Sequence, residues 1–202
     1  MTRSARLLVA LGLNLALVVG LGYVGVSAHS LGVLAAGLDY LADAAAIGVA
    51  VLAIRLSARF PKANILAAAL NAGWLFVLSI LVVATAIDRL ALRPPQVQGL
   101  PVVVMSVIAG GVMIAAAVVL RIDFDGDDDS DEALSHRAVL LDTVADAASA
   151  FGVAGAGAVI LATGGWHWLD PAVALAIALV VGWRAFLVLR KVQGSLRATA
   201  PG

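Results

Sequence analysis

The chain has 202 residues, 62% of them hydrophobic, and a mean hydropathy of +1.04. This composition is too apolar for a soluble domain and is typical of a polytopic membrane protein in a lipid bilayer. The 13 basic and 13 acidic residues balance, and no cysteine is present. Without cysteine, any metal must be bound through oxygen or imidazole. We predict no nucleic-acid partner and no enzymatic activity.

Six apolar runs follow one another along the chain, each close to the roughly 20 residues that a helix needs to cross a bilayer. They lie at about 5–28, 31–54, 63–87, 98–120, 138–163 and 171–190. An open sheet cannot cross lipid, and the runs lack strand alternation. The sequence therefore predicts an all-α membrane protein, with a six-transmembrane-helix bundle over residues 1–192. Residues 193–202 are expected to form a short tail without a cytoplasmic domain.

The basic residues are distributed unevenly across these spans. If the N-terminus is inside, eleven Lys and Arg residues lie on the inner side, and only Arg89 and Arg93 lie outside. The positive-inside rule then places the N- and C-termini in the cytoplasm, with the chain in the cell membrane. A cleaved signal peptide ending near Val26–Ala28 is the other interpretation of the first run. That run is, however, longer than the roughly 7 to 15 apolar residues of such signals.

The connection at 121–137 differs from the others because it carries seven acidic residues between Asp123 and Glu132. Such a block is typical of a solvated acidic cytoplasmic loop. The alternative is a collector that raises the local concentration of divalent cations near the mouth of the bundle. An EF-hand is excluded, because Asp128 and Leu134 stand where that loop requires Gly and Glu.

Two aspartate pairs lie inside apolar runs: Asp39 with Asp43, and Asp142 with Asp146. Each pair has the spacing D-x-x-x-D, which places both carboxylates on one face of a helix. An acidic residue at the centre of a membrane helix costs roughly 2.5 to 3.5 kcal/mol on insertion scales. Neither run contains Lys or Arg. The pairs therefore predict that a cation from outside the chain binds here.

The two pairs belong to a short internal repeat. Leu38 to Ala45 reads LDYLADAA, and Leu141 to Ala148 reads LDTVADAA. In the predicted topology these two spans run in opposite directions, and alanines on the acidic face allow helices to approach closely. We expect the four carboxylates to converge near the middle of the bilayer. A chance recurrence in an alanine-rich chain, or a proton-sharing structural network, is the other interpretation.

Four carboxylates in one dry cavity determine the expected chemistry. Their mutual repulsion predicts that the empty site holds protons, and a divalent cation replaces those protons because ligation requires the ionised form. If the cavity opens alternately to each side, this competition is a metal/proton antiport. An oxygen-only shell suits Mn²⁺ and tolerates Zn²⁺, Fe²⁺, Co²⁺ or Cd²⁺. The metal would be the transported substrate, and no cofactor is predicted.

The three histidines lie outside these pairs. His29 and His167 are predicted to be surface residues at the outer interface. His136 stands six residues before Asp142, which is not the spacing of one helix face, and a role in metal entry is the lesser alternative.

Taken together, these features resemble the cation diffusion facilitator family of divalent metal transporters. The resemblance covers roughly Leu7 to Lys191 and includes the LRPPQVQG loop and the turn Trp168-Leu169-Asp170-Pro171. It implies that the second and fifth spans each supply an (H/D)-x-x-x-D pair to one tetrahedral transport site. The matching positions are Asp39, Asp43, Asp142 and Asp146.

The chain departs from the family pattern in two respects. Zinc-selective members usually have histidine where this chain has Asp39 and Asp142, and the all-aspartate pattern is more similar to manganese-transporting or broader members. Members also typically continue into a cytoplasmic metal-sensing domain, whereas this chain stops at Gly202. Dimerisation is therefore expected to depend on the membrane helices, as a homodimer.

The resemblance implies an efflux transporter that exports a divalent transition metal from the cytoplasm in exchange for protons. One alternative is a non-transporting paralogue that stores metal or pairs with a full-length transporter. Another is a proton-translocating or structural bundle that binds no metal.

Overall fold

The computed structural model describes residues 3–56, 63–92, 95–122 and 131–198. These residues form six α-helices and contain no strand, so the predicted all-α, six-helix fold is confirmed. The helices are α1 (Arg3–Ser27), α2 (Leu31–Leu56), α3 (Ala63–Ala91), α4 (Gly99–Ile122), α5 (Asp131–Thr163) and α6 (Leu169–Ala198).

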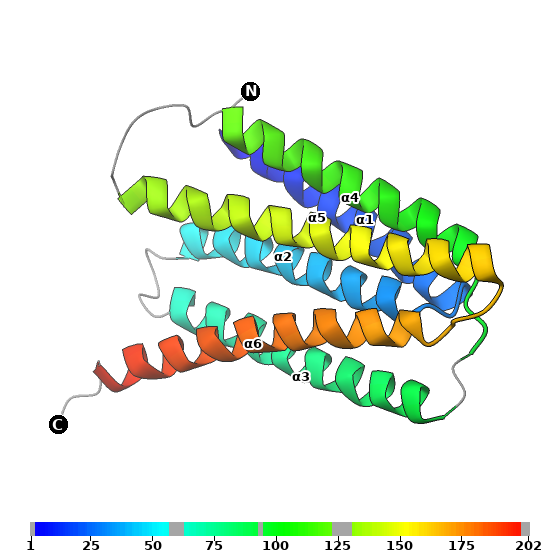
Figure 1. Cartoon of the computed structure of the whole chain (residues 1–202). Coiled ribbons are helices and arrows are strands. Elements are labelled where there is room, and N and C mark those ends of the chain that lie inside the picture. Colours follow the sequence, from blue (N-terminus) through cyan, green and yellow to red (C-terminus); the bar gives the residue numbers. More distant parts are fainter. Residues whose placement is uncertain (1–2, 57–62, 93–94, 123–130, 199–202) are drawn as a thin grey trace.

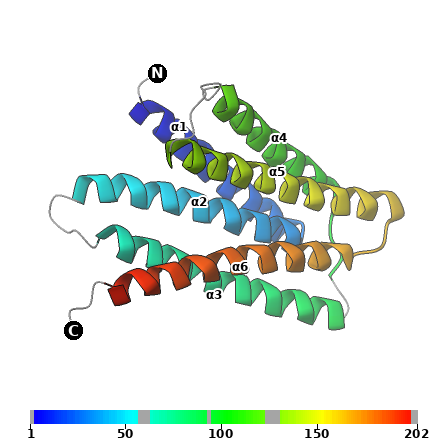
Figure 2. The same ribbon diagram turned by 60° about the vertical axis from the view of Figure 1, so that its left-hand side comes forward.

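Helix α2 lies at the centre of the bundle. The most extensive contacts join α4 to α5, α3 to α6 and α1 to α2, and α2 also contacts α3, α5 and α6. Figures 1 and 2 show α1, α4 and α5 on one side of α2, with α3 and α6 on the other. The segments 28–30, 95–98 and 164–168 lie together at one end of the bundle, here called the connection end (Figure 1). Helix α1 begins and α6 ends at the opposite end.

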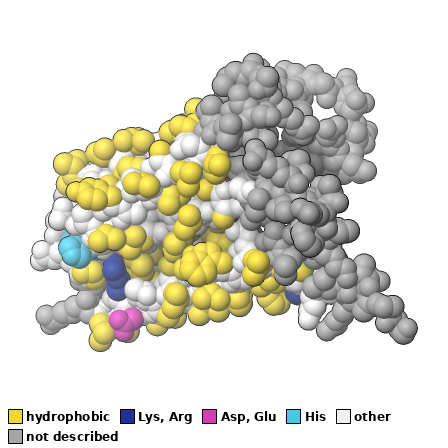
Figure 3. All heavy atoms as spheres, turned by 180° about the vertical axis from the view of Figure 1, so that it is seen from behind, with side chains coloured by type: hydrophobic (Ala, Val, Ile, Leu, Met, Phe, Trp, Pro, Cys, Tyr) yellow, Lys and Arg dark blue, Asp and Glu magenta, His cyan; other side chains and the backbone are white. Residues whose placement is uncertain are grey.

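The surface of the bundle is suited to lipid. Four described segments are long and apolar enough to cross a bilayer: Ala68–Ala91, Gly99–Ala116, Thr143–Thr163 and Leu169–Gly194. In α1 the described apolar segment, Leu11–Ser27, is shorter. Hydrophobic side chains cover much of the described surface in Figure 3, with few charged ones among them. Apolar surface this extensive is unusual on a soluble monomer. The chain is therefore a multi-pass membrane protein.

Helices α5 and α6 extend furthest beyond their predicted ends. Helix α5 begins at Asp131, so residues 131–137 of the predicted acidic loop are helical, while residues 123–130 lie outside the described ranges. Helix α6 continues to Ala198, through part of the predicted tail. Hydropathy marks the part of a helix in lipid and does not mark where the helix ends.

The turn between α1 and α2 is closed by backbone hydrogen bonds. The His29 N–H donates to the Val26 carbonyl at 3.3 Å, and the Ser30 N–H donates to the Gly25 carbonyl at 3.0 Å. His29 has a φ of 58°. This is the Schellman pattern at a helix C-terminus, with histidine in the left-handed position that glycine usually takes. The turn fixes the start of α2 relative to the end of α1.

Helices α4 and α5 approach each other closely at Gly99. A Cβ atom at this position would lie 2.6 Å from the carbonyl oxygen of Gly157 and 2.8 Å from the backbone nitrogen of Leu161. Both are backbone atoms of α5, so a side-chain rotation cannot relieve the contact. The close packing of α4 on α5 therefore requires glycine at position 99.

We expect Gly99→Ala to destabilise the protein by about 1 to 3 kcal/mol, the usual cost of overpacking, because α4 must move away from α5. Thermal unfolding of the purified protein in detergent measures this effect. Gly111→Ala on the same helix is the matched control, since nothing lies within 4 Å of a Cβ there. The control should keep the wild-type Tm, and a wild-type Tm for Gly99→Ala would refute the expected clash.

Candidate functional site

The two aspartate pairs lie on neighbouring helices. Asp39 and Asp43 are half-buried on α2, and Asp146 is buried on α5 with 6% of its surface exposed. Asp142 is one turn before Asp146 on α5, and its side chain lies outside the described part of the structure. Helices α2 and α5 pack against each other and run in opposite directions (Figure 1). This agrees with the relative direction that the sequence predicts for the two spans.

Both pairs lie far from the helix ends. Asp43 is near the midpoint of α2 (Leu31–Leu56), and Asp146 is near the midpoint of α5 (Asp131–Thr163). Alanines flank both positions, and Ala42, Ala44 and Ala147 are buried. Small residues at a helix contact let the two backbones approach closely. The acidic residues therefore lie near the middle of their helices, where a charged side chain costs the most free energy in a membrane.

The four-ligand site stays a prediction. Among the side chains that the structure describes, no three His, Cys, Asp or Glu residues are grouped closely enough to hold a metal ion. Asp39, Asp43 and Asp146 each take part in polar or electrostatic interactions. The chemistry of the donor set is that of a hard-cation or zinc site, because carboxylate oxygens ligate such ions.

Tyr40 is a residue of this region that the sequence reasoning missed. Its side chain is 2% exposed, and its hydroxyl has no hydrogen-bond partner among the described residues. It stands on α2 between Asp39 and Asp43, and Asp146 is the buried acid of the neighbouring helix α5. The sequence signal was the single polar-tipped aromatic residue in the LDYLADAA repeat, where the second copy has threonine.

Asp170 anchors the start of α2 at the connection end. This residue of α6 is 2% exposed. Its carboxylate accepts hydrogen bonds from the Leu31 N–H at 2.6 Å and the Gly32 N–H at 3.1 Å, and also from the Ser30 hydroxyl. The Ser30 oxygen in turn accepts from the Val33 N–H at 3.1 Å, as an N-cap residue does. Asp170 thus satisfies backbone donors that the first turn of a helix leaves unpaired.

Arg89 joins α3 to the same anchor. Its Nη1 lies 4.0 Å from Oδ2 of Asp170 and donates a hydrogen bond to the His29 carbonyl at 2.8 Å. Gly32 allows Asp170 to approach, since a Cβ there would lie 3.1 Å from Oδ1. The helix that carries Asp39 and Asp43 is therefore held at its start by α3 and α6 together.

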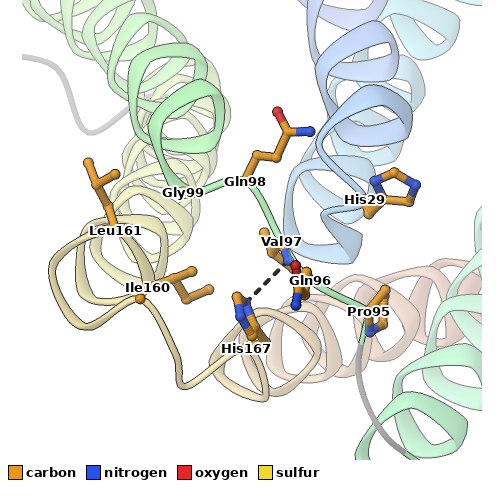
Figure 4. A pocket seen from close by; sticks show the side chains of 10 residues that line it. His29, Pro95, Gln96, Val97, Gln98, Gly99, Ile160, Leu161 and His167 are labelled. Atoms are coloured by element: carbon orange, nitrogen blue, oxygen red, sulfur yellow. Dashed lines mark hydrogen bonds between the residues drawn. The ribbon is translucent and has the colours of Figure 1, made fainter.

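A cavity of about 620 Å³ also lies at the connection end. Residues of all three connections line it, among them His29, Gln96, Gln98 and His167 (Figure 4). Asp39, Asp43 and Asp146 are not among its lining residues. In Figure 4 the His29 ring does not point toward His167. The arrangement does not bring the two histidines together as a pair of metal ligands.

The two histidines differ in environment. His29 is exposed, as predicted, whereas His167 is half-buried and Nδ1 of His167 accepts a hydrogen bond from the Val97 N–H at 3.2 Å (Figure 4). The prediction that His167 is a surface residue therefore holds only in part, because its side chain is half-buried. Its ring accepts a hydrogen bond from a backbone N–H of the segment between α3 and α4. No local sequence pattern predicts this tertiary contact. The side chain of His136 lies outside the described part of the structure.

Comparison with known families decides the class of this protein. The family described as the cation efflux transmembrane domain matches residues 7–196. The chain belongs to the cation efflux family. The resemblance to cation diffusion facilitators that the sequence motifs indicate is thereby confirmed, and the match includes α2 and α5 with both aspartate pairs.

Curated relatives of this cation efflux domain are about 30% identical or less. The metal cation efflux system protein CzcD of Cupriavidus metallidurans is 30% identical over 82% of this chain and 53% of the relative. The zinc transporter ZitB of Yersinia pestis is 29% identical over 99% of this chain and 65% of the relative. A cadmium, cobalt and zinc/H(+)-K(+) antiporter of Bacillus velezensis is 27% identical over 78% and 51%, respectively. The cation efflux domain thus spans about half to two thirds of the length of these proteins.

Proposed function

We propose that this cation efflux domain moves a divalent transition metal out of the cytoplasm in exchange for protons. The observation that carries the proposal is the pair of D-x-x-x-D motifs near the midpoints of two packed, antiparallel helices, α2 and α5, in a chain of the cation efflux family. The ligands would be Asp39, Asp43, Asp142 and Asp146.

The burial of these acidic residues supports a role in transport. A carboxylate at membrane depth is costly unless a cation or proton neutralises it, and such residues commonly mark ion pathways. Asp146 is 6% exposed, and Asp39 and Asp43 are half-buried. A site of this depth can exchange ligands with only one side at a time if the helices rearrange around it. The same carboxylates would carry protons on the return step, because ligation requires their ionised form.

The names of the relatives and the type of ligand limit the choice of the transported ion. The names of the relatives include zinc, cadmium and cobalt. Four carboxylates form an oxygen-only shell, which also suits Mn²⁺. We therefore propose that the transported ion is Zn²⁺, Cd²⁺ or Co²⁺. Because all four proposed ligands are aspartates, Mn²⁺ is a further candidate.

Topology and assembly follow from the same proposal. With both termini in the cytoplasm, the connection end faces outward, and α1 and α2 cross the bilayer along with the other four helices. A homodimer would form through the membrane helices.

Transport by the wild-type chain in proteoliposomes tests the function. Vesicles containing a pH-sensitive dye are given external Zn²⁺, Cd²⁺, Co²⁺ or Mn²⁺, and both metal uptake and internal pH are followed. We expect metal entry to be accompanied by a rise in internal pH, and an acidic interior to accelerate uptake. Competition among the four ions then ranks their affinities.

Two results would count against the proposal in different ways. Metal uptake with no change in internal pH would refute proton exchange while keeping efflux. No uptake of any of the four ions, in vesicles where the protein is folded, would refute metal transport by this chain.

A further inference from the structure

The Tyr40 hydroxyl is a buried group that the fold does not explain. Tyr40 is among the largest side chains that the protein encloses fully, at 2% exposure, and its oxygen has no hydrogen-bond partner among the described residues. An unpaired hydroxyl in an apolar surrounding is costly, and such exceptions in native proteins call for an explanation. Phenylalanine would fill the same space without that cost.

The position of Tyr40 relates it to both aspartate pairs. It stands between Asp39 and Asp43 on α2 and belongs to the same buried core as Ala147 and Ala150 of α5. Small alanines on the facing helix leave room for an aromatic ring. Asp146, the acid of α5 directly before Ala147, is buried as well, at 6% exposure, and α2 packs against α5. The ring therefore lies in the buried core that α2 and α5 share, next in sequence to a candidate ligand.

We propose that the Tyr40 hydroxyl donates a hydrogen bond to the Asp146 carboxylate when a divalent cation is bound, and so positions this ligand. The proposal rests on the function given above. A carboxylate has two oxygens, so one can bind the cation while the other accepts the phenolic O–H. Hydrogen bonds to an ionised acceptor are about twice as strong as neutral ones, which gives the hydroxyl its partner in the loaded state.

This positioning affects which ions the site accepts. An oxygen that accepts the hydrogen bond of Tyr40 is a weaker and less freely oriented donor to the metal, which favours binding of Asp146 through its other oxygen alone. Monodentate carboxylates suit the four-coordinate, tetrahedral geometry of Zn²⁺, whereas larger ions use bidentate carboxylates and additional oxygens. Tyr40 is thus a specificity-determining residue that favours Zn²⁺ over larger ions such as Cd²⁺.

Tyr40→Phe tests the proposal, because it removes the oxygen and keeps the ring. Calorimetry on the purified protein should show Zn²⁺ binding weakened roughly tenfold, the lower range for loss of a group that orients a metal ligand. The preference for Zn²⁺ over Cd²⁺ should fall as well. The Tm of the metal-free protein should stay the same or rise, since the variant removes an unpaired buried hydroxyl.

Two variants serve as matched controls. Tyr23→Phe makes the same change at a tyrosine that is 75% exposed on α1. Ser106→Ala removes another buried hydroxyl without a partner among the described residues, on α4, which carries none of the four aspartates. Both should bind Zn²⁺ as the wild type does.

The possible outcomes separate this role from a structural one and from failure of the site. Unchanged Zn²⁺ affinity in Tyr40→Phe would overturn the proposal. Weaker binding together with a lower metal-free Tm would also overturn it, because lost packing would then account for the effect. Absence of Zn²⁺ and Cd²⁺ binding in the wild type would overturn the metal site itself, and this proposal with it.

Discussion

Asp146→Asn is expected to abolish metal-coupled proton release in proteoliposomes. The substitution keeps the size of the side chain and removes one of the four proposed carboxylate ligands. Two unit charges 4 Å apart attract by about 4 kcal/mol at an effective dielectric constant of 20. Loss of such an interaction weakens binding on the order of a thousandfold, since each 1.4 kcal/mol corresponds to about tenfold. Calorimetry should therefore detect no Zn²⁺ binding at concentrations that saturate the wild type.

The same result is expected for Asp43→Asn, the half-buried acid near the midpoint of α2. Asp88→Asn is the matched control, because Asp88 is an exposed acid on α3. It should transport as the wild type does. Removing a charge at membrane depth lowers repulsion among the acids, so neither Asp146→Asn nor Asp43→Asn should reduce the Tm of the metal-free protein. Undiminished transport in both variants would show that these carboxylates are not the transport ligands.

The bundle could be predicted because hydropathy and helix length are local properties. Every predicted span corresponds to one helix, and α2 begins at Leu31 as predicted. The antiparallel packing of α2 on α5 follows because successive spans alternate in direction, so the second and fifth run opposite ways. The helical residues 131–137 and 193–198 were missed because they are polar, and hydropathy does not distinguish a polar helix from a loop.

The contacts that position the site could not be predicted because they join residues far apart in the sequence. The turn that contains Asp170 is visible as a motif. Its use as the acceptor for the first donors of α2, 138 to 140 residues away, is a property of the folded chain. From the sequence His167 is an interfacial residue. Only the structure shows that its ring accepts a hydrogen bond from the Val97 N–H. From the sequence Tyr40 is an ordinary core aromatic residue. Only the structure shows that its hydroxyl is buried without a hydrogen-bond partner among the described residues.

Asp170→Ala is expected to have the largest effect on stability. It leaves the Leu31 and Gly32 N–H groups and the Ser30 hydroxyl without their acceptor, and Arg89 without its carboxylate. Removing one member of a buried charged contact costs about 3 to 5 kcal/mol. For a chain of this size the change corresponds to a decrease in Tm on the order of 10 °C. Thermal unfolding in detergent measures it.

Variants at two acids distinguish the anchor from a general charge effect. Asp170→Asn keeps one acceptor oxygen for the start of α2, so its Tm should lie between those of the wild type and Asp170→Ala. Asp88→Ala removes an exposed carboxylate from α3 and should leave the Tm unchanged. Because α2 carries Asp39 and Asp43, release of its first turn should also slow metal uptake in vesicles. A wild-type Tm for Asp170→Ala would mean that the backbone donors of α2 find other partners, and the anchor would then have no role in holding the site.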